Sequence, residues 1–110
     1  MTSPRDPQLL KGILPTLVLA LLRREESYGY ELVTRLQAGG LADVATGTVY
    51  PILTRLEREG SITSRLVPSS SGPARKYYAP TPVGTARLAQ GLTAWHDLID
   101  VVDTLTTGEF

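Results

Sequence analysis

The sequence predicts a mainly α-helical domain that carries one small β-hairpin and ends in a long helix. Three observations support this fold class. Apolar residues recur every three or four positions through most of the chain. A short stretch of alternating β-forming residues follows the third helical segment, and clusters of Gly, Pro and Ser separate the segments. The 110 residues match the usual size of a single domain.

The first helix is expected from Gln8 or Leu9 to about Arg24, because a broad apolar face runs through this segment. Pro15 lies inside it and removes one backbone hydrogen bond. Two starting points are therefore open. The helix begins at Gln8 or Leu9, or the continuous helix starts at about Leu14 after a looser lead-in. The apolar run is about half as long as a membrane span requires, which favours a buried helix.

A second helix is expected over residues 28–38. Ser27 is a suitable N-cap, because its hydroxyl can accept a hydrogen bond from the first turn. The inner face is apolar and consists of Leu32, Val33 and Leu36. Gly39 and Gly40 end the helix.

The third helix is expected to begin with Thr46 as its cap and to end at Gly60. Its apolar side chains share one face, which consists of Val49, Ile52, Leu53 and Leu56. Pro51, early in the helix, should remove one hydrogen bond and tilt the first turn. The other faces offer hydroxyls, a phenol and a guanidinium near the N-terminal end. Those groups suit the major groove of DNA.

The rest of the chain predicts a hairpin and a long final helix. Residues 61–67 form the first strand, residues 68–73 a loop, and residues 75–80 the returning strand. Thr81 then caps a helix that begins with a proline and runs to about Leu105. Three helices, a two-stranded hairpin and a further helix are the element order of a winged helix-turn-helix.

Several motifs, taken in order, resemble the PadR family of transcriptional regulators. They are LLKG at 9–12, LVLALL at 17–22, YGYEL at 28–32, GTVYPILxRLExEG at 47–60, GPARKYY at 72–78 and TxxG at 81–84. Each motif alone is weak, but their combined order and spacing are specific. Pro15 departs from the family pattern, which more often has a helix-favouring residue there.

The resemblance implies a division of the chain into two parts. Residues 1–80 form the winged helix-turn-helix DNA-binding domain. Residues 81–110 form a C-terminal dimerisation helix packed on the same domain, as in the short-tailed branch of the family. Members of the family are mostly repressors, and some of them respond to small aromatic compounds.

The DNA-binding candidates come from the third helix and the hairpin. They are Thr46, Thr48, Val49, Tyr50, Arg55, Arg75, Lys76 and Tyr77. Val49 could touch a thymine methyl or belong to the core, and Arg55 could instead pair with Glu59 at i+4. We expect Arg75, Lys76 or both to contact phosphate. The alternative for this pair is a solvated hairpin edge that discourages pairing with other strands.

Formal charge sums to zero over the chain but is unevenly distributed. Residues 1–59 carry seven bases and seven acids, residues 60–96 four bases and no acid, and residues 97–110 four acids and no base. Such asymmetry bears on binding partners where the total does not. The acid-free segment is thus a candidate phosphate-binding surface, and the acidic end is not expected to approach DNA.

Trp95, the only tryptophan, lies in the middle of the last helix. One interpretation is an anchor in a dimer interface. The other is that two Trp95 side chains line a cavity that accepts a small planar aromatic effector. The remaining residues expected around that cavity are the apolar Leu92, Leu9 and Ile13 and the acidic Asp97 and Asp100, which would attract a cationic ligand.

Together these observations predict a homodimeric, sequence-specific DNA-binding regulator of the cytoplasm, a repressor that acts at a pseudo-palindromic operator in double-stranded DNA and is relieved by the effector. The alternative is a winged-helix protein-interaction module without DNA binding. The sequence offers no nucleophile–base pair or phosphate-binding loop, so no enzyme is expected. Without cysteines and with His96 as the lone histidine, no metal site or cofactor is expected either. No signal peptide or membrane anchor is expected.

Overall fold

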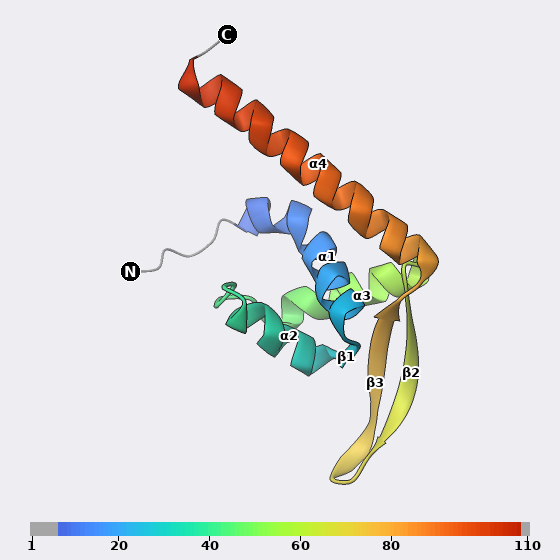
Figure 1. The fold of residues 1–110 in the computed structure, drawn as a ribbon. Helices are drawn as coiled ribbons and strands as arrows, with labels where there is room; N and C mark the ends of the chain where they lie inside the picture. Colours follow the sequence, from blue (N-terminus) through green and yellow to red (C-terminus); the bar gives the residue numbers. More distant parts are fainter. Residues whose placement is uncertain (1–6, 109–110) are drawn as a thin grey trace.

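A computed structural model describes residues 7–108 (Figure 1). The elements in chain order are α1 (Pro7–Arg24), β1 (Ser27–Tyr28), α2 (Gly29–Ala38), α3 (Thr46–Arg58), β2 (Ile62–Ser69), β3 (Gly72–Pro80) and α4 (Pro82–Thr107). The strands form one antiparallel sheet in the order β1-β3-β2. The fold is therefore mainly α with a small sheet, as the sequence predicts. Within residues 7–108 no helix is long and apolar enough to cross a membrane.

Helix α1 is continuous through Pro15, which decides between the two predicted starting points in favour of the earlier one. The proline costs one intrahelical hydrogen bond. Its ring is buried, and Leu14, Val18 and Leu22 on the same helix are at most 2% exposed. Burial of these side chains offsets the lost bond, because each contributes about 1.5–3 kcal/mol of transfer free energy.

The predicted N-caps of α2 and α3 are each wrong by one residue. Ser27 belongs to β1, where it pairs with Tyr78, and the cap position of α2 is Tyr28. Thr46 is the first helical residue of α3, and Ala45 occupies the cap position. Neither cap provides a side-chain hydrogen bond to its helix. The Ser27 hydroxyl instead accepts a hydrogen bond from a guanidinium.

That guanidinium is Arg35 of α2, a residue that the sequence did not single out. Its Nη1 donates to the Ser27 hydroxyl at 2.6 Å and to the Glu25 carbonyl at 2.9 Å. Its Nη2 donates to the Leu21 carbonyl at 2.9 Å. Arg35 therefore ties the end of α1 and the start of β1 to α2.

The hairpin, here called the wing (residues 62–80), is longer than predicted. The strands reach Ser69 on one side and Gly72 on the other, so the predicted loop over residues 68–73 shrinks to a tight turn. Pro68 continues β2 because the pairing is irregular between Val67 and Ser69, and an edge strand with a bulge tolerates a missing donor. The longer strands carry the wing well away from the helices (Figure 1).

The core lies between α1, α2, α3 and the base of the wing. Its largest fully buried apolar side chains are Leu14, Leu19, Leu22, Leu32, Leu53, Leu56 and Ile62. The predicted apolar face of α3 is confirmed, with Val49, Leu53 and Leu56 at 0% exposure and Ile52 packed against them. Helix α3 is therefore fixed to the core along one side and open along the other.

Helix α4 packs on α1 only along its N-terminal part. The predicted cap is confirmed, because the Thr81 hydroxyl accepts from the Gly84 amide at 3.1 Å. Gly84 lies against the Ser61 carbonyl, so a Cβ there would collide with backbone. Leu88 is buried, and every described residue after Gly91 is exposed. Figure 1 shows the C-terminal half of α4 extending beyond the other elements.

Candidate nucleic-acid interface

The N-terminal end of α3 presents polar side chains to solvent. Thr46 and Thr48 are exposed, and Tyr50 is 43% exposed. Ala45 at the cap position offers no side-chain acceptor, so the amides of Thr46 and Gly47 depend on water or an external acceptor, whereas the Thr48 amide already donates to the Ala45 carbonyl at 3.0 Å. An anion is a favourable acceptor at such a helix end.

Tyr50 is held in place by its contact with the start of α2. A Cβ at Gly29 would lie 2.7 Å from the Tyr50 hydroxyl oxygen and still closer to the ring, so only glycine lets the ring lie there. Gly29 itself is buried. The hydroxyl end of the ring thus lies against Gly29, and 43% of the residue is still exposed.

Val49 does not belong to the interface. Its side chain is 0% exposed and packs in the core with the other apolar residues of α3. Of the two predicted roles for Val49, the structure supports the core role and rules out contact with a thymine methyl in this conformation. The reason is helical periodicity: Val49 shares a face with Leu53 and Leu56.

Arg55 is exposed and makes the i+4 contact that the sequence allowed. Its Nε lies 3.9 Å from a Glu59 carboxylate oxygen, and about half of each side chain is open to solvent. An exposed pair of this length contributes little to stability. Arg55 is therefore free to exchange its carboxylate partner for a phosphate.

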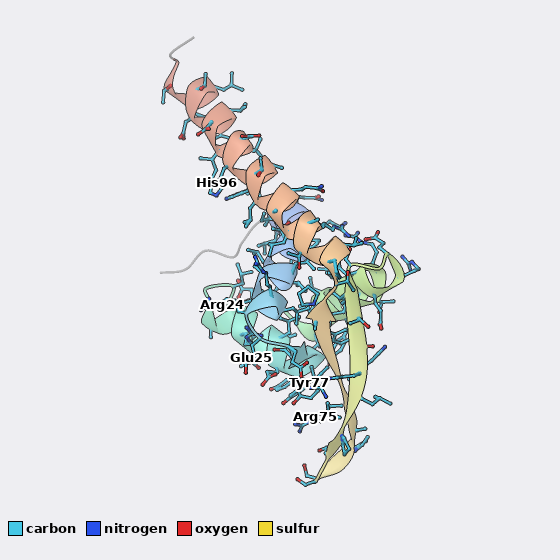
Figure 2. All side chains as sticks on the ribbon, turned by 45° about the vertical axis from the view of Figure 1, so that its right-hand side comes forward. Arg24, Glu25, Arg75, Tyr77 and His96 are labelled. Carbon is cyan, nitrogen blue, oxygen red and sulfur yellow. The ribbon has the colours of Figure 1, made fainter. Side chains whose placement is uncertain are left out.

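The outward face of the sheet carries a stack of arginine and tyrosine side chains. The rings of Tyr28 and Tyr77 lie edge to face with centroids 5.3 Å apart. The Arg75 guanidinium lies 4.5 Å from the Tyr28 centroid, and that of Arg65 lies 6.0 Å from the Tyr77 centroid. Figure 2 shows Arg75 and Tyr77 following each other along the wing. Tyr77 is half-buried, whereas Arg75 is exposed and has no carboxylate partner among residues 7–108.

Lys76 points to the other face of the sheet and contacts α3. Its Nζ lies 3.2 Å from a Glu57 carboxylate oxygen and 5.6 Å from the Tyr78 ring centroid. The Ser64 hydroxyl donates to the same carboxylate at 2.6 Å. The bond from Ser64, assisted by Lys76, holds the pKa of Glu57 below its usual value, and the bond to Glu57 raises the pKa of Lys76. Arg75 and Lys76 therefore differ in role, as strand alternation predicts.

Carboxylates from other parts of the chain offset most of the positive charge of the acid-free segment (residues 60–96). Arg65 pairs with Glu26, Lys76 with Glu57, and Arg87 with Glu59. Each partner carboxylate comes from residues 1–59. Three of the four cations in this candidate phosphate-binding segment are therefore already paired, and Arg75 is the remaining one.

The predicted effector residues lie in two groups. Trp95 and Leu92, 41% and 40% exposed, share a face of α4, and Leu9 is exposed and Ile13 half-buried on α1. None of these four residues lines the groove between α1 and α3 or the shallow depression on α4.

The predicted acidic residues do not join Trp95 within one chain. Asp97 follows Trp95 by two residues and so points about 200° away around the helix, where it borders a shallow depression with Gln90 and Thr93. Asp100 lies about 140° from Trp95 by the same geometry. His96 lies on the protruding part of α4 (Figure 2), and residues 7–108 hold no group of three side chains able to bind a metal ion.

Two helices joined by a short connection, a solvent-facing third helix and a wing define a winged helix-turn-helix protein. The comparisons with known proteins narrow this class. The sequence pattern of the transcriptional regulator PadR-like family matches residues 18–90. The chain belongs to this family, whose members are DNA-binding transcriptional regulators, not enzymes.

Solved structures support the assignment over most of the chain. A PadR-like transcriptional regulator from Bacillus cereus is 40% identical, with 93% of this chain and 99% of that chain covered and a TM-score of 0.80. A transcriptional regulator from Streptococcus is 38% identical, with 92% and 99% covered and a TM-score of 0.82. A PadR family regulator from Eggerthella lenta is 38% identical, with 90% and 86% covered and a TM-score of 0.83.

Proposed function

We propose that the protein is a homodimeric repressor that binds a pseudo-palindromic operator in the cytoplasm. The N-terminal end of α3 enters the major groove, and the wing follows the flanking backbone or minor groove. The observation that carries this proposal is the position of Tyr50. It lies on the open side of α3, and Gly29 fixes its place.

The contacts divide between reading and positioning. In this proposal Thr46, Thr48 and Tyr50 contact base edges or the nearest phosphate. Their exposure at the start of α3 supports it, and the amides of Thr46 and Gly47 favour a phosphate beside them. Arg75 contributes an exposed guanidinium whose Cζ lies 4.5 Å from the centroid of the Tyr28 ring. Lys76 must first leave Glu57, so we expect a smaller contribution from it.

The second copy would meet the first through α4. Seven large apolar residues of its C-terminal part are exposed in the single chain: Leu92, Trp95, Leu98, Ile99, Val101, Val102 and Leu105. An apolar surface of this extent calls for a partner. With two copies, two α3 helices would meet successive major grooves about one helical turn apart. A protein-interaction module without DNA binding would not need the exposed Tyr50 and Arg75.

The effector proposal also requires two copies. Trp95 and Leu92 of each α4, with Leu9 and Ile13 of α1, would line a cavity at the dimer centre for a planar aromatic ligand. Quenching of Trp95 fluorescence by a planar cationic dye supports this cavity. Unchanged fluorescence leaves Trp95 as an interface anchor alone.

The test of the DNA proposal uses fluorescence anisotropy with duplex DNA from upstream of the protein's own gene and a scrambled duplex of equal length. We expect tighter binding to the upstream duplex and a steep loss of affinity with salt. Tyr50→Ala and Arg75→Ala should each weaken binding about tenfold, as loss of one good contact does, and Lys76→Ala less. All three variants should remain dimers in light scattering.

Gln90→Ala, on an exposed part of α4, serves as the control and should bind DNA normally. If Tyr50→Ala and Arg75→Ala both bind the upstream duplex as tightly as the unchanged protein, the docking arrangement is wrong. If no duplex binds at all, the protein-interaction alternative replaces it.

A further inference from the structure

A groove of about 620 Å³ lies between α1, α3 and the connection that precedes α3. Its volume is in the range of sites that bind drug-sized ligands. The effector cavity proposed above needs a second copy, whereas this groove exists within one chain. Of the residues proposed to bind an effector, none lines it.

The floor of the groove is apolar. Leu14 and Val44, 1% and 6% exposed, line it together with Pro15, which is also buried. Ile52 of α3 and Leu10 of α1 are half-buried walls. An occupant would therefore be held by an apolar body that covers these side chains.

The rim is positively charged. Lys11, Arg55 and Arg58 line it and are exposed, against a single carboxylate, Asp43. Lys11 has no ion-pair partner among residues 7–108, and Arg55 has only its long contact to Glu59. Three cations against one anion leave an excess of positive charge that an anionic head group would neutralise.

We propose that this groove binds a small amphipathic organic anion, an apolar body that ends in one carboxylate or sulfonate. The body lies on Leu14, Val44 and Ile52, and the head group lies between Lys11 and the arginines of α3. Guanidinium and ammonium groups suit such oxyanions.

The location predicts the direction of the effect on DNA. Thr48 and Arg55 line the groove and are also proposed DNA contacts. An anion seated against Arg55 competes with phosphate for the same guanidinium and repels the DNA backbone. Occupancy should therefore weaken DNA binding, a consequence that rests on the docking arrangement proposed above.

The binding test uses the full-length protein without DNA. The probe is 8-anilinonaphthalene-1-sulfonate, whose fluorescence rises on an apolar site. Decanoate, below its micelle concentration, should displace the probe, and decylammonium at the same concentration should not, because the two share a tail and differ only in head-group charge. Equal displacement by both would overturn the proposal, since it would indicate a purely apolar surface such as the open face of α4.

Charge variants locate the site. Lys11→Glu combined with Arg58→Glu should weaken probe binding at least tenfold, and Asp43→Asn should strengthen it. The matched control is Arg23→Glu with Arg24→Glu, two exposed cations at the other end of α1, about 18 Å along the helix from Lys11. It should bind the probe normally. If both double variants bind alike, the groove is not the site.

The final arm measures DNA affinity with and without decanoate. The unchanged protein should lose several-fold in affinity when decanoate is present, and the Lys11→Glu, Arg58→Glu variant should lose nothing further. If decanoate binds in the groove without changing DNA affinity, the competition is overturned. A protein that binds decanoate but no DNA at all contradicts the proposed function instead.

Discussion

Helices α3 and α4 are both amphipathic, but only one of them has its apolar face covered. Val49, Leu53 and Leu56 of α3 are fully buried within the chain. The corresponding residues in the second half of α4, such as Leu98 and Val102, are about half exposed. Within one chain, therefore, α3 has its apolar face covered, whereas the end of α4 leaves its apolar residues open, as the proposed dimer requires.

This contrast fits the separate tasks that we propose for the two helices. A helix that reads DNA must be held at a fixed angle, and the buried face of α3 supplies that rigidity. A helix that joins two copies has to keep its apolar residues available. The four predictions that follow test this contrast, from the largest expected effect to the smallest.

Leu53→Ala should strongly destabilise the fold, because it leaves a cavity in the fully packed face of α3. We expect a loss of about 2–5 kcal/mol in the free energy of unfolding, measured by urea denaturation. Leu105→Ala, at an exposed position of α4, should lose less, and its loss should vary with protein concentration because it comes from the dimer. Equal losses independent of concentration would remove the contrast.

Charges placed on the open face of α4 should separate the copies. Leu98→Asp combined with Val102→Asp should give a monomer in light scattering, because two carboxylates would be buried unpaired in the interface. Operator affinity should then fall roughly 100-fold, as expected when two linked contacts become one. Thr93→Asp with Thr104→Asp adds the same charges at exposed positions about 120–180° away around the helix and should remain a dimer. A dimeric Leu98, Val102 variant would exclude α4 as the interface.

Gly29→Ala should disturb the N-terminal end of α3 and leave α4 untouched. The new methyl collides with the Tyr50 ring, which must move, at a cost of about 1–3 kcal/mol. In a Tyr50→Ala background the same substitution should cost clearly less, because the ring is absent. Thermal unfolding of the four proteins measures this coupling. Additive losses would show that Tyr50 does not depend on Gly29.

Acid should weaken the link between α3 and the wing. The pKa of Glu57 lies below its ordinary value of 4.5, so its contribution to stability is complete above that value and is lost as the pH falls through the lower pKa of the folded protein. Glu57→Gln lacks this dependence. The stability difference between the two proteins, followed by thermal unfolding from pH 7 to pH 2.5, should shrink toward the acid end. A constant difference would mean that Lys76 and Ser64 do not stabilise the ionised carboxylate.

The fold was largely predictable because its signals are local. Apolar spacing located α3 and α4, and Thr81 with the following proline predicted the start of α4 correctly. Capping was less predictable, because the Ser27 hydroxyl is claimed by Arg35, eight residues later in the chain. The continuation of β2 through Pro68 was also not predictable from local sequence, since it depends on the irregular pairing with β3.

Within the site, helical periodicity predicted which side chains are buried or open, but the sequence did not predict which charged side chains pair with each other. Tyr50 lies on the open side of α3 and Val49 in the core, as the helical pattern allowed. Glu57 as partner of Lys76, Glu26 as partner of Arg65 and Tyr28 beneath Arg75 were not foreseen. These contacts join segments that are far apart in sequence, and a count of charges along the chain contains no information about them.

The pairing of Lys76 with Glu57 has a thermodynamic consequence for DNA binding. A free lysine that neutralises a phosphate releases a condensed counterion, and this release makes affinity depend on salt. Lys76 is instead already paired with Glu57. When Lys76 exchanges Glu57 for a phosphate, the freed carboxylate must be solvated by water and cations, so the exchange releases little net salt. If the wing contacts DNA as proposed, the slope of affinity against salt should therefore report fewer phosphate contacts than the wing forms.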